Sequence, residues 1–443
     1  MPAHKKRFPM AVALLLLLML CGLGLVRSAD IRTGCDAGAE VVLPEQNAYE
    51  SCPVSETAEA GSSAEDMFSS DVLSDGEAQQ LQADCREIAA CYQDLYQQAE
   101  KVPSITMAGE EILLQEDMDR IEDRLAALGY AVLNTDSRYP AFLEHSQGLR
   151  QFWQMVQQGG SGRQDIIWIS ADGGFTFCRF ETSPQENRIV EAVVQWKDGQ
   201  AAAITELYAQ QILDWELTDQ GSFYYQTRVF SSPTFENYVL IRLNRPDQTL
   251  WDLNAAYVEP VGYQGNNLFL CDWSHADYGA LSFNDLLEPL YQLQHGYPLA
   301  ADTFPLQRQS GCREVPAALF EQTILPYFDV SLGTFRQKSR YDAQSSIYPW
   351  AESENGSRTE YPTLLPEVVA YRNNPDGTLT LTVQAMCVTW KTDCLFSHAV
   401  TIDTDPDGSF RYLGNQILSR SDRYPMPDGR ARLDDALKDK QKT

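Results

Sequence analysis

Two turn sequences of the same kind most limit what the C-terminal part of this chain can fold into. Asn374-Pro375-Asp376-Gly377 and Asp405-Pro406-Asp407-Gly408 each place a proline, a carboxylate and a glycine where a tight turn needs them. Such short connections join antiparallel strands, because parallel strands require a long crossover. Strand-forming runs lie on both sides of the turns, at 368–372, 378–389, 394–402 and 410–417.

Helical patterns precede these strands, at 316–327 and 331–337. A helix followed by an antiparallel sheet is the arrangement of cystatin-like and nuclear-transport-factor-like (NTF2-like) folds, which we take as an analogy only.

Nearer the N-terminus, apolar residues recur every three or four positions and predict three helices. The helices are expected from Ser74 to Pro103, from Glu110 to Leu128 and from Pro140 to Gln158, with the first two forming a helical hairpin. Short Ile-, Val- and Phe-rich runs between glycine turns then predict an antiparallel β-meander, at 165–170, 175–180, 188–196, 223–230 and 238–243. A further helix is expected near 283–293.

The expected fold class is therefore α+β. We predict a helical segment at 76–160, an α+β domain rich in antiparallel strands at 161–305, a C-terminal α+β domain at 306–420 and a tail at 421–443.

The first 28 residues have the pattern of an export signal. Lys5, Lys6 and Arg7 precede an apolar stretch at 8–26, whose length is at the lower limit for crossing a bilayer. A signal peptide cleaved after Ser28 and a retained signal anchor both stay open, and Cys21 adds lipidation as a less favoured alternative. Because the positive cluster stays inside, we expect the rest to be extracytoplasmic, either membrane-anchored through this segment or secreted.

The charge balance limits the partners of the chain. The 34 Lys and Arg residues face 62 Asp and Glu residues, which gives a net charge of −28 that repels phosphate backbones and excludes nucleic acid as a partner. Residues 29–75 contain one basic residue, Arg32, and are dominated by Ser, Ala, Gly and Glu, so a disordered acidic linker is predicted there.

One motif suggests a metal. Asp403, Asp405 and Asp407, followed by Gly408, repeat the D-x-D-x-D-G opening of a calcium loop. Gly414 occupies the twelfth position, where such a loop has a bidentate Glu. A β-hairpin turn explains every residue of the motif and is the preferred interpretation, with calcium as the alternative. No cofactor is predicted.

Catalytic residues cannot be assigned from the sequence. Nucleophile-type side chains precede histidines in Cys271 to His275 and in Ser397-His398, but adjacency does not align a nucleophile with a base. No nucleophile elbow, zinc-protease or phosphate-loop motif is present.

Two pairs of cysteines and several aromatic clusters lie close together in the sequence. Proximity makes Cys35 with Cys52, and Cys387 with Cys394, candidate disulfides. Aromatic clusters at 223–225 and 348–350 and at Trp273 could stack on sugars or peptides, although core packing is the preferred explanation.

Four segments carry a family resemblance. They are Leu319-Phe320-Glu321 through Tyr327-Phe328, Tyr341-Asp342 to Tyr348-Pro349-Trp350, Pro375 to Leu381 and Asp393 to His398. They resemble an uncharacterised family of exported, membrane-anchored bacterial proteins, most clearly over residues 315 to 418 and more broadly after about residue 105. As a domain-of-unknown-function family, it implies a location and a fold but transfers no active residue.

We therefore expect a non-catalytic binding or envelope-interaction module whose partner is an unknown envelope protein or glycan. The alternative is a hydrolase that acts on cell-wall or carbohydrate material. A binder should have an apolar, aromatic-lined cavity, whereas a glycosidase needs two carboxyl groups about 5 to 10 Å apart.

Overall fold

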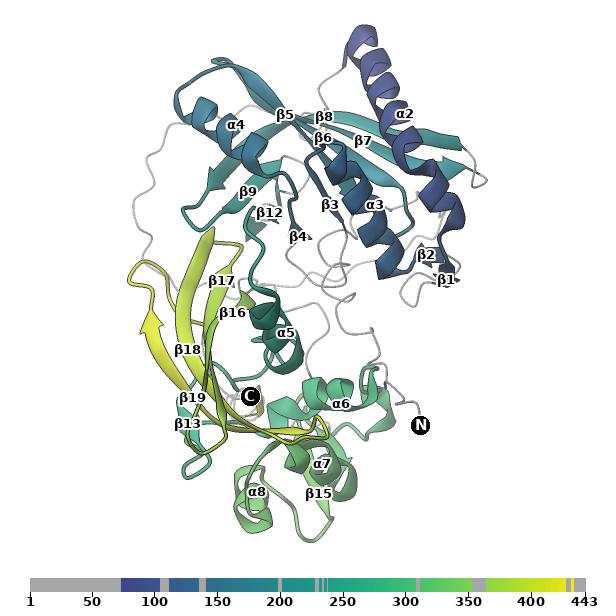
Figure 1. The fold of residues 1–443 in the computed structure, drawn as a ribbon. Helices are drawn as coiled ribbons and strands as arrows, with labels where there is room; N and C mark the ends of the chain where they lie inside the picture. Colours follow the sequence, from purple (N-terminus) through teal and green to yellow (C-terminus); the bar gives the residue numbers. More distant parts are fainter. Residues whose placement is uncertain are drawn as a thin grey trace, which may run out of the picture.

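The computed structural model describes residues 73–103, 111–134, 141–197, 201–227, 231–232, 235–236, 238–307, 311–352, 364–427 and 432–433. The predicted export signal and nearly all of the acidic linker lie outside these residues. The described chain is α+β, as predicted, and forms two lobes (Figure 1). Within the described ranges, no helix combines the length and apolar character needed to span a membrane.

Lobe one consists of three helices and a large sheet. The helices are α2 (Asp75–Gln98), α3 (Gln115–Ala127) and α4 (Gln147–Gln157). Helices α2 and α3 pack on one face of the sheet, against residues such as Ile167 and Phe177. Helix α4 packs on the other face, with Phe152 against Ile166 and its neighbours. Alternate residues of each strand therefore supply two separate cores.

The sheet of lobe one has eight strands in the order β3-β5-β6-β7-β8-β9-β12-β4. Its longest strand, β8, pairs with β7 along its first part and with β9 along its last part, so it bends between them. The two edge strands meet where the Glu144 N–H donates to the Val132 carbonyl at 2.8 Å, which curls the sheet onto itself. The strands are β3 (Val132–Asn134), β4 (Ala141–Phe142), β5 (Gly162–Ile169), β6 (Phe175–Thr182), β7 (Asn187–Lys197), β8 (Ala201–Leu217), β9 (Ser222–Thr227) and β12 (Val239–Arg242).

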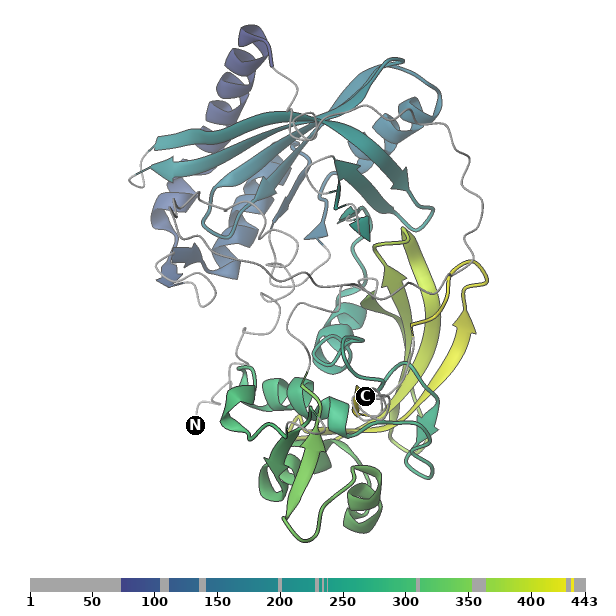
Figure 2. The ribbon, with the colours of Figure 1, turned by 180° about the vertical axis from the view of Figure 1, so that it is seen from behind.

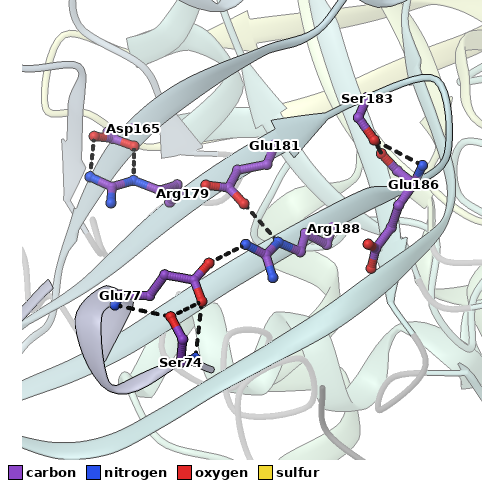
Figure 3. A network of polar contacts seen from close by, with 8 residues as sticks. All are labelled: Ser74, Glu77, Asp165, Arg179, Glu181, Ser183, Glu186 and Arg188. Atoms are coloured by element: carbon purple, nitrogen blue, oxygen red, sulfur yellow. Dashed lines mark hydrogen bonds and ion pairs between the residues drawn. The ribbon is translucent and has the colours of Figure 1, made fainter. Parts of the chain in front are cut away.

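Polar contacts fasten the beginning of α2 to this sheet (Figure 3). The hydroxyl of Ser74 accepts from the Glu77 N–H, and the Glu77 carboxylate accepts from the Ser74 N–H, which forms a capping box. Arg188 on β7 then bridges Glu77 at 2.6 Å and Glu181 at 2.7 Å. Hydrogen bonds from Ser74, aided by Arg188, lower the pKa of Glu77 to about 2. Together, these contacts fix where α2 begins.

Lobe two has one core between its helices and a curved sheet. The helices α5 (Gln248–Tyr257), α6 (Leu287–His295) and α7 (Ala317–Ile324) share this core with the strands, and α8 (Leu332–Lys338) lies beside α7. Figure 2 shows the sheet curving around this helical side. The antiparallel order is β13 (Trp273–Ser274), β19 (Phe410–Arg420), β18 (Thr392–Thr404), β17 (Leu379–Cys387) and β16 (Leu364–Asn373).

Both predicted Pro-Asp-Gly turns close hairpins of this sheet. Gly377 joins β16 to β17 with a φ of 88°, and Gly408 joins β18 to β19 with a φ of 87°. A side chain is strained in that left-handed region, so glycine is needed at both positions.

Short elements complete the fold. They are β1 (Lys101–Pro103) with β2 (Glu111–Leu113), β10 (Ser231–Ser232) with β11 (Phe235–Glu236), β14 (Arg313–Pro316) with β15 (Ile347–Trp350), and the 3-10 turns η3 (Asn284–Leu286), η4 (Ala301–Thr303) and η5 (Leu325–Tyr327).

Some elements differ from the sequence predictions. The helix expected from Glu110 begins only at Gln115, because Glu111–Leu113 pairs with β1. The helix expected from Pro140 begins at Gln147, because Ala141–Phe142 pairs with β12 as strand β4. Strand β8 and helix α5 were not predicted.

The hydrophobic contacts group the residues differently from the predicted domain ranges. The helices within 76–160 pack in the same hydrophobic cores as strands within 161–243. A separate core contains residues from Val258 to Tyr412. The chain passes from lobe one to lobe two through the connection at 244–247, between β12 and α5. Within the predicted tail, Arg432 and Leu433 are buried against lobe two, where the Arg432 N–H donates to Asp285 at 2.9 Å.

Candidate functional site

The lobes meet where the turn between β17 and β18 reaches β9 and β12. An apolar cluster lies at this junction and combines residues of lobe one (Tyr224, Tyr238 and Leu240) with residues of lobe two (Leu365, Met386 and Val388). Lys391 of the turn forms ion pairs with Asp214 and Glu216 on β8. The junction therefore contains apolar contacts and ion pairs contributed by both lobes.

Arg242 is the buried cation of this junction. Its side chain is 5% exposed and contacts Glu367 of lobe two at 2.9 Å. It donates to the Ser222 hydroxyl at 3.0 Å and lies 3.8 Å from Asp393. Ser222 in turn donates to Asp393. Burial raises the pKa of Glu367, and Arg242 partly opposes that rise.

A small cavity lies beside this network, between β4, α5, β16 and β17. Its volume is about 10 Å³, which is room for about one water molecule. The cavity is lined by Phe142, Pro246, Leu250, Trp251, Asn254, Pro366, Glu367, Val368 and Met386. Asn254 is 6% exposed, and its Oδ1 receives no hydrogen bond from the described residues. A buried acceptor without a donor costs free energy, so this atom indicates a place for a donor group.

A cluster of carboxylates adjoins the cavity. The Arg245 guanidinium, on the connection between the lobes, lies over the ring of Phe142, and that ring meets Trp251 edge to face. Arg245 Nη2 is 3.1 Å from Glu144 Oε1 and 3.7 Å from Glu122 Oε1. These two distances place the carboxylate oxygens no more than about 7 Å apart.

Glu122 is the buried member of this cluster. Its Oε2 accepts from Asn134 Nδ2, while its Oε1 receives no hydrogen bond from the described residues. Burial raises the pKa of Glu122 to about 8, opposed by Arg245 and reinforced by Glu144 and Asp119. A carboxyl group with this pKa is mostly protonated at neutral pH, and such strongly shifted groups are enriched in functional sites.

A larger groove of about 230 Å³ lies between α2 and the β7–β8 hairpin. Its lining is Gln82, Cys85, Arg86, Val194, Ala202, Ala203 and Ile204. Burial raises the pKa of the Cys85 thiol to about 12, so the groove offers no reactive thiolate. We therefore take the junction between the lobes as the candidate site, although the groove has the larger volume.

The three aspartates of the predicted calcium motif lie in the β18–β19 hairpin. Asp403 pairs with Arg411 at 2.9 Å, and Asp405 and Asp407 accept hydrogen bonds from Ser409. Among the described residues, no three histidine, cysteine or acidic side chains gather closely enough to hold a metal ion. The hairpin turn stays the preferred interpretation of the motif, and calcium binding stays its untested alternative.

The Ser397-His398 pair does not form a catalytic dyad. The two residues are neighbours on β18 and point to opposite faces of the sheet. Ser397 bonds to Ser419, while buried His398 lies between the hydroxyl of Tyr263 at 2.9 Å and Asn415 Oδ1 at 2.7 Å. Burial lowers the pKa of His398 to about 4, so the imidazole is neutral at physiological pH.

Cys271 and His275 also bond to separate partners. The Cys271 thiol donates to the Asn267 carbonyl at 3.3 Å, and burial raises its pKa to about 11. His275 is exposed and lies 3.8 Å from Asp329.

The proposed disulfide between Cys387 and Cys394 was wrong. Both are free thiols, because Cys387 lies opposite Thr392 in the β17–β18 register. Cys394 is two residues further along its strand. The other proposed pair, Cys35 and Cys52, lies outside the described residues.

The aromatic clusters belong to the hydrophobic core, which was the explanation preferred over stacking on sugars or peptides. Phe223, Tyr224, Tyr225, Trp273, Tyr348 and Trp350 are all buried.

Sequence reasoning missed the residues of the candidate site. Glu122 follows Met118 by four residues and precedes Leu125 by three, so it lies on the apolar face of its helix. A carboxylate in that position is the signal that could have identified it. Asp247 is the N-cap of α5, and its side chain accepts a hydrogen bond from the Thr249 N–H. An aspartate in this position could have indicated the start of the helix.

Comparison with known proteins gives a family and no function. No curated protein and no solved structure matches the chain. A sequence-family model matches residues 78–428, which extends the resemblance to include nearly all of α2. The chain therefore belongs to DUF6070, a family of unknown function.

Proposed function

We propose that this protein is a non-catalytic binding module that acts outside the cytoplasmic membrane and that the lobe junction receives one donor group of its ligand, because the cavity there has room for about one water-sized group. The observation that carries the proposal is the free acceptor of Asn254, which lies buried in a cavity that both lobes line. Ligand sites commonly lie between domains and combine apolar walls with a few polar groups. Phe142, Trp251 and Glu367 supply such walls and such a group here.

The chemistry of the other candidate groups favours binding over catalysis. Imidazole and thiol groups that catalyse must be accessible and able to change their charge near neutral pH. His398 is enclosed between Tyr263 and Asn415, and the pKa values of Cys85 and Cys271 are raised to about 12 and about 11. The location rests on the cationic and apolar leader.

Affinity capture of the tagged full chain from native envelopes tests this function. Proteins and glycans that co-purify are identified by mass spectrometry and compared with those retained by Asn254→Leu, which removes the free acceptor at nearly constant volume. A remote variant of an exposed residue, Tyr297→Ala, is the matched control. We expect a component that the wild type and Tyr297→Ala retain and Asn254→Leu loses. Equal retention by all three, or recovery of cytoplasmic proteins alone, would contradict the proposal.

A hydrolase is the second candidate, because Glu122 and Glu144 approach within the range of glycosidase carboxyl pairs. Against it, Arg245 lies within 3.7 Å of both carboxylates and would have to leave before a scissile bond could enter between them. Turnover of cell-wall glycans that is lost in Glu122→Gln would establish the hydrolase. Absence of turnover by the wild-type chain would exclude the hydrolase hypothesis.

A further inference from the structure

We propose that Glu122 and Glu144 form a recognition site for an organic cation, a guanidinium or primary ammonium group, and that Arg245 is its internal occupant. This inference rests on the proposed function, since it names the class of ligand that the lobe junction would take.

The charge balance of the cluster favours a cation. Asp119, Asp123 and Glu144 all act electrostatically on Glu122, and Arg245 is the cation that opposes them. Glu122 therefore experiences three further carboxyl groups and one guanidinium. A further cation reduces their mutual repulsion, whereas an anion increases it.

A free acceptor shows where a donor would bind. Glu122 has a side chain that is 8% exposed, and its Oε1 receives no hydrogen bond from the described residues. Arg245 Nη2, at 3.7 Å, is too distant for a hydrogen bond. The second oxygen of Glu122 already accepts from Asn134, so Oε1 is the remaining acceptor.

Arg245 is held loosely enough to be displaced. Its side chain is 54% exposed, and its closest ionic contact is Glu144 at 3.1 Å. The ring of Phe142 lies 5.6 Å from the guanidinium carbon and offers a π face to any cation in this position. Exposed ion pairs of this kind are worth at most about a fivefold change in an equilibrium constant, so a ligand with more donors can compete.

The donor set fits an organic cation better than a metal ion. Asn134 directs its Nδ2 group toward Glu122, and an N–H donor does not ligate a metal. The described carboxylates also do not converge as three metal ligands. A guanidinium or ammonium group supplies several N–H donors, which a carboxylate oxygen and an aromatic face can both receive.

Cation binding is expected to release a proton. Glu122 has a pKa of about 8, so its carboxyl group is mostly protonated at pH 7. A bound cation stabilises the carboxylate and lowers this pKa. Close to one proton should therefore leave for each cation bound at pH 7.

Isothermal titration calorimetry on the full chain tests the site. The probes are a blocked Gly-Arg-Gly peptide and spermidine, each titrated at pH 7 in phosphate and in MOPS, because buffers with different ionisation enthalpies reveal proton release and neither of these buffers carries a primary ammonium group. The variants are Arg245→Ala, Arg245→Lys and Glu122→Gln. Arg120→Ala is the matched control, since Arg120 is an exposed arginine of the same helix as Glu122 and pairs with Asp117.

We expect Arg245→Ala to bind a probe about two- to fivefold more tightly than the wild type, with buffer-dependent heat, and Arg245→Lys and Arg120→Ala to resemble the wild type. Glu122→Gln should lose the proton release. The peptide arm identifies a guanidinium ligand and the spermidine arm an ammonium ligand.

Equal affinity of Arg245→Ala and the wild type, or binding without proton release, would overturn the inference. Thermal unfolding confirms that each variant is folded, and Arg245→Ala tests the site even where Glu122→Gln does not fold. Failure here, with envelope capture that still depends on Asn254, would leave the binding function standing and remove only the cationic ligand.

Discussion

Replacing Arg242 by methionine should weaken the junction between the lobes. The change keeps much of the side-chain volume but removes the cation that Glu367 contacts at 2.9 Å and that lies 3.8 Å from Asp393. Both carboxyl groups are largely buried, with side chains 17% and 6% exposed. Breaking a buried pair by removing one partner costs about 3–5 kcal/mol, because the remaining charge is left uncompensated.

The loss of stability should depend on pH. Burial raises the folded-state pKa of Glu367 above its unfolded value, and Arg242 lowers it, so the variant raises this pKa further. A carboxyl group with a raised folded-state pKa binds its proton more tightly in the folded chain. The variant should therefore recover stability as the pH falls from 7 toward about 4.3, the unfolded value for glutamate.

Urea unfolding at pH 7 and pH 5, followed by far-UV circular dichroism, measures the effect. The triple variant Arg242→Met with Glu367→Gln and Asp393→Asn removes the stranded charges and should regain most of the loss. Arg120→Met is the control, since its exposed pair with Asp117 contributes at most about 1 kcal/mol. A loss below about 1 kcal/mol at pH 7, or one that grows at pH 5, would refute the reasoning.

Three further outcomes are expected. Arg432→Ala should cost lobe two about 3 kcal/mol in urea unfolding, because it strands buried Asp285, and an unchanged midpoint would refute this. The free energy of unfolding of lobe two should fall by about 3 kcal/mol between pH 6.5 and 4, because His398 has a folded-state pKa of about 4 and is protonated first in the unfolded chain. His398→Leu should make the free energy of unfolding less dependent on pH in this range. The melting temperature should not change when EDTA and then calcium are added, whereas a calcium-dependent rise would assign Asp403, Asp405 and Asp407 to a metal.

Local signals in the sequence were sufficient for several elements. The start of α2 follows from Ser74 and Glu77, which form the capping box, and the hairpins of lobe two follow from the turns that end at Gly377 and Gly408. These features depend on residues within a few positions of one another. Long-range pairing decided the rest. Ala141–Phe142 is a strand only because β12 lies beside it, and the polar, alanine-rich β8 is held by partners on both sides.

The candidate site was not predictable for the same reason. Glu122 and Arg245 are far apart in the sequence, and only the curled sheet of lobe one and the path of the connection bring them together. The acceptor of Asn254 gains its significance from burial between two lobes, which no local pattern encodes.

The connection at 244–247 also determines how the molecule would carry a mechanical load. With lobe one tethered at its N-terminal side and a partner pulling on lobe two, tension would run through this segment and through the contacts of Arg242. Arg245 lies on that segment and pairs with Glu144 of lobe one, so this ion pair is among the contacts that such a load would reach.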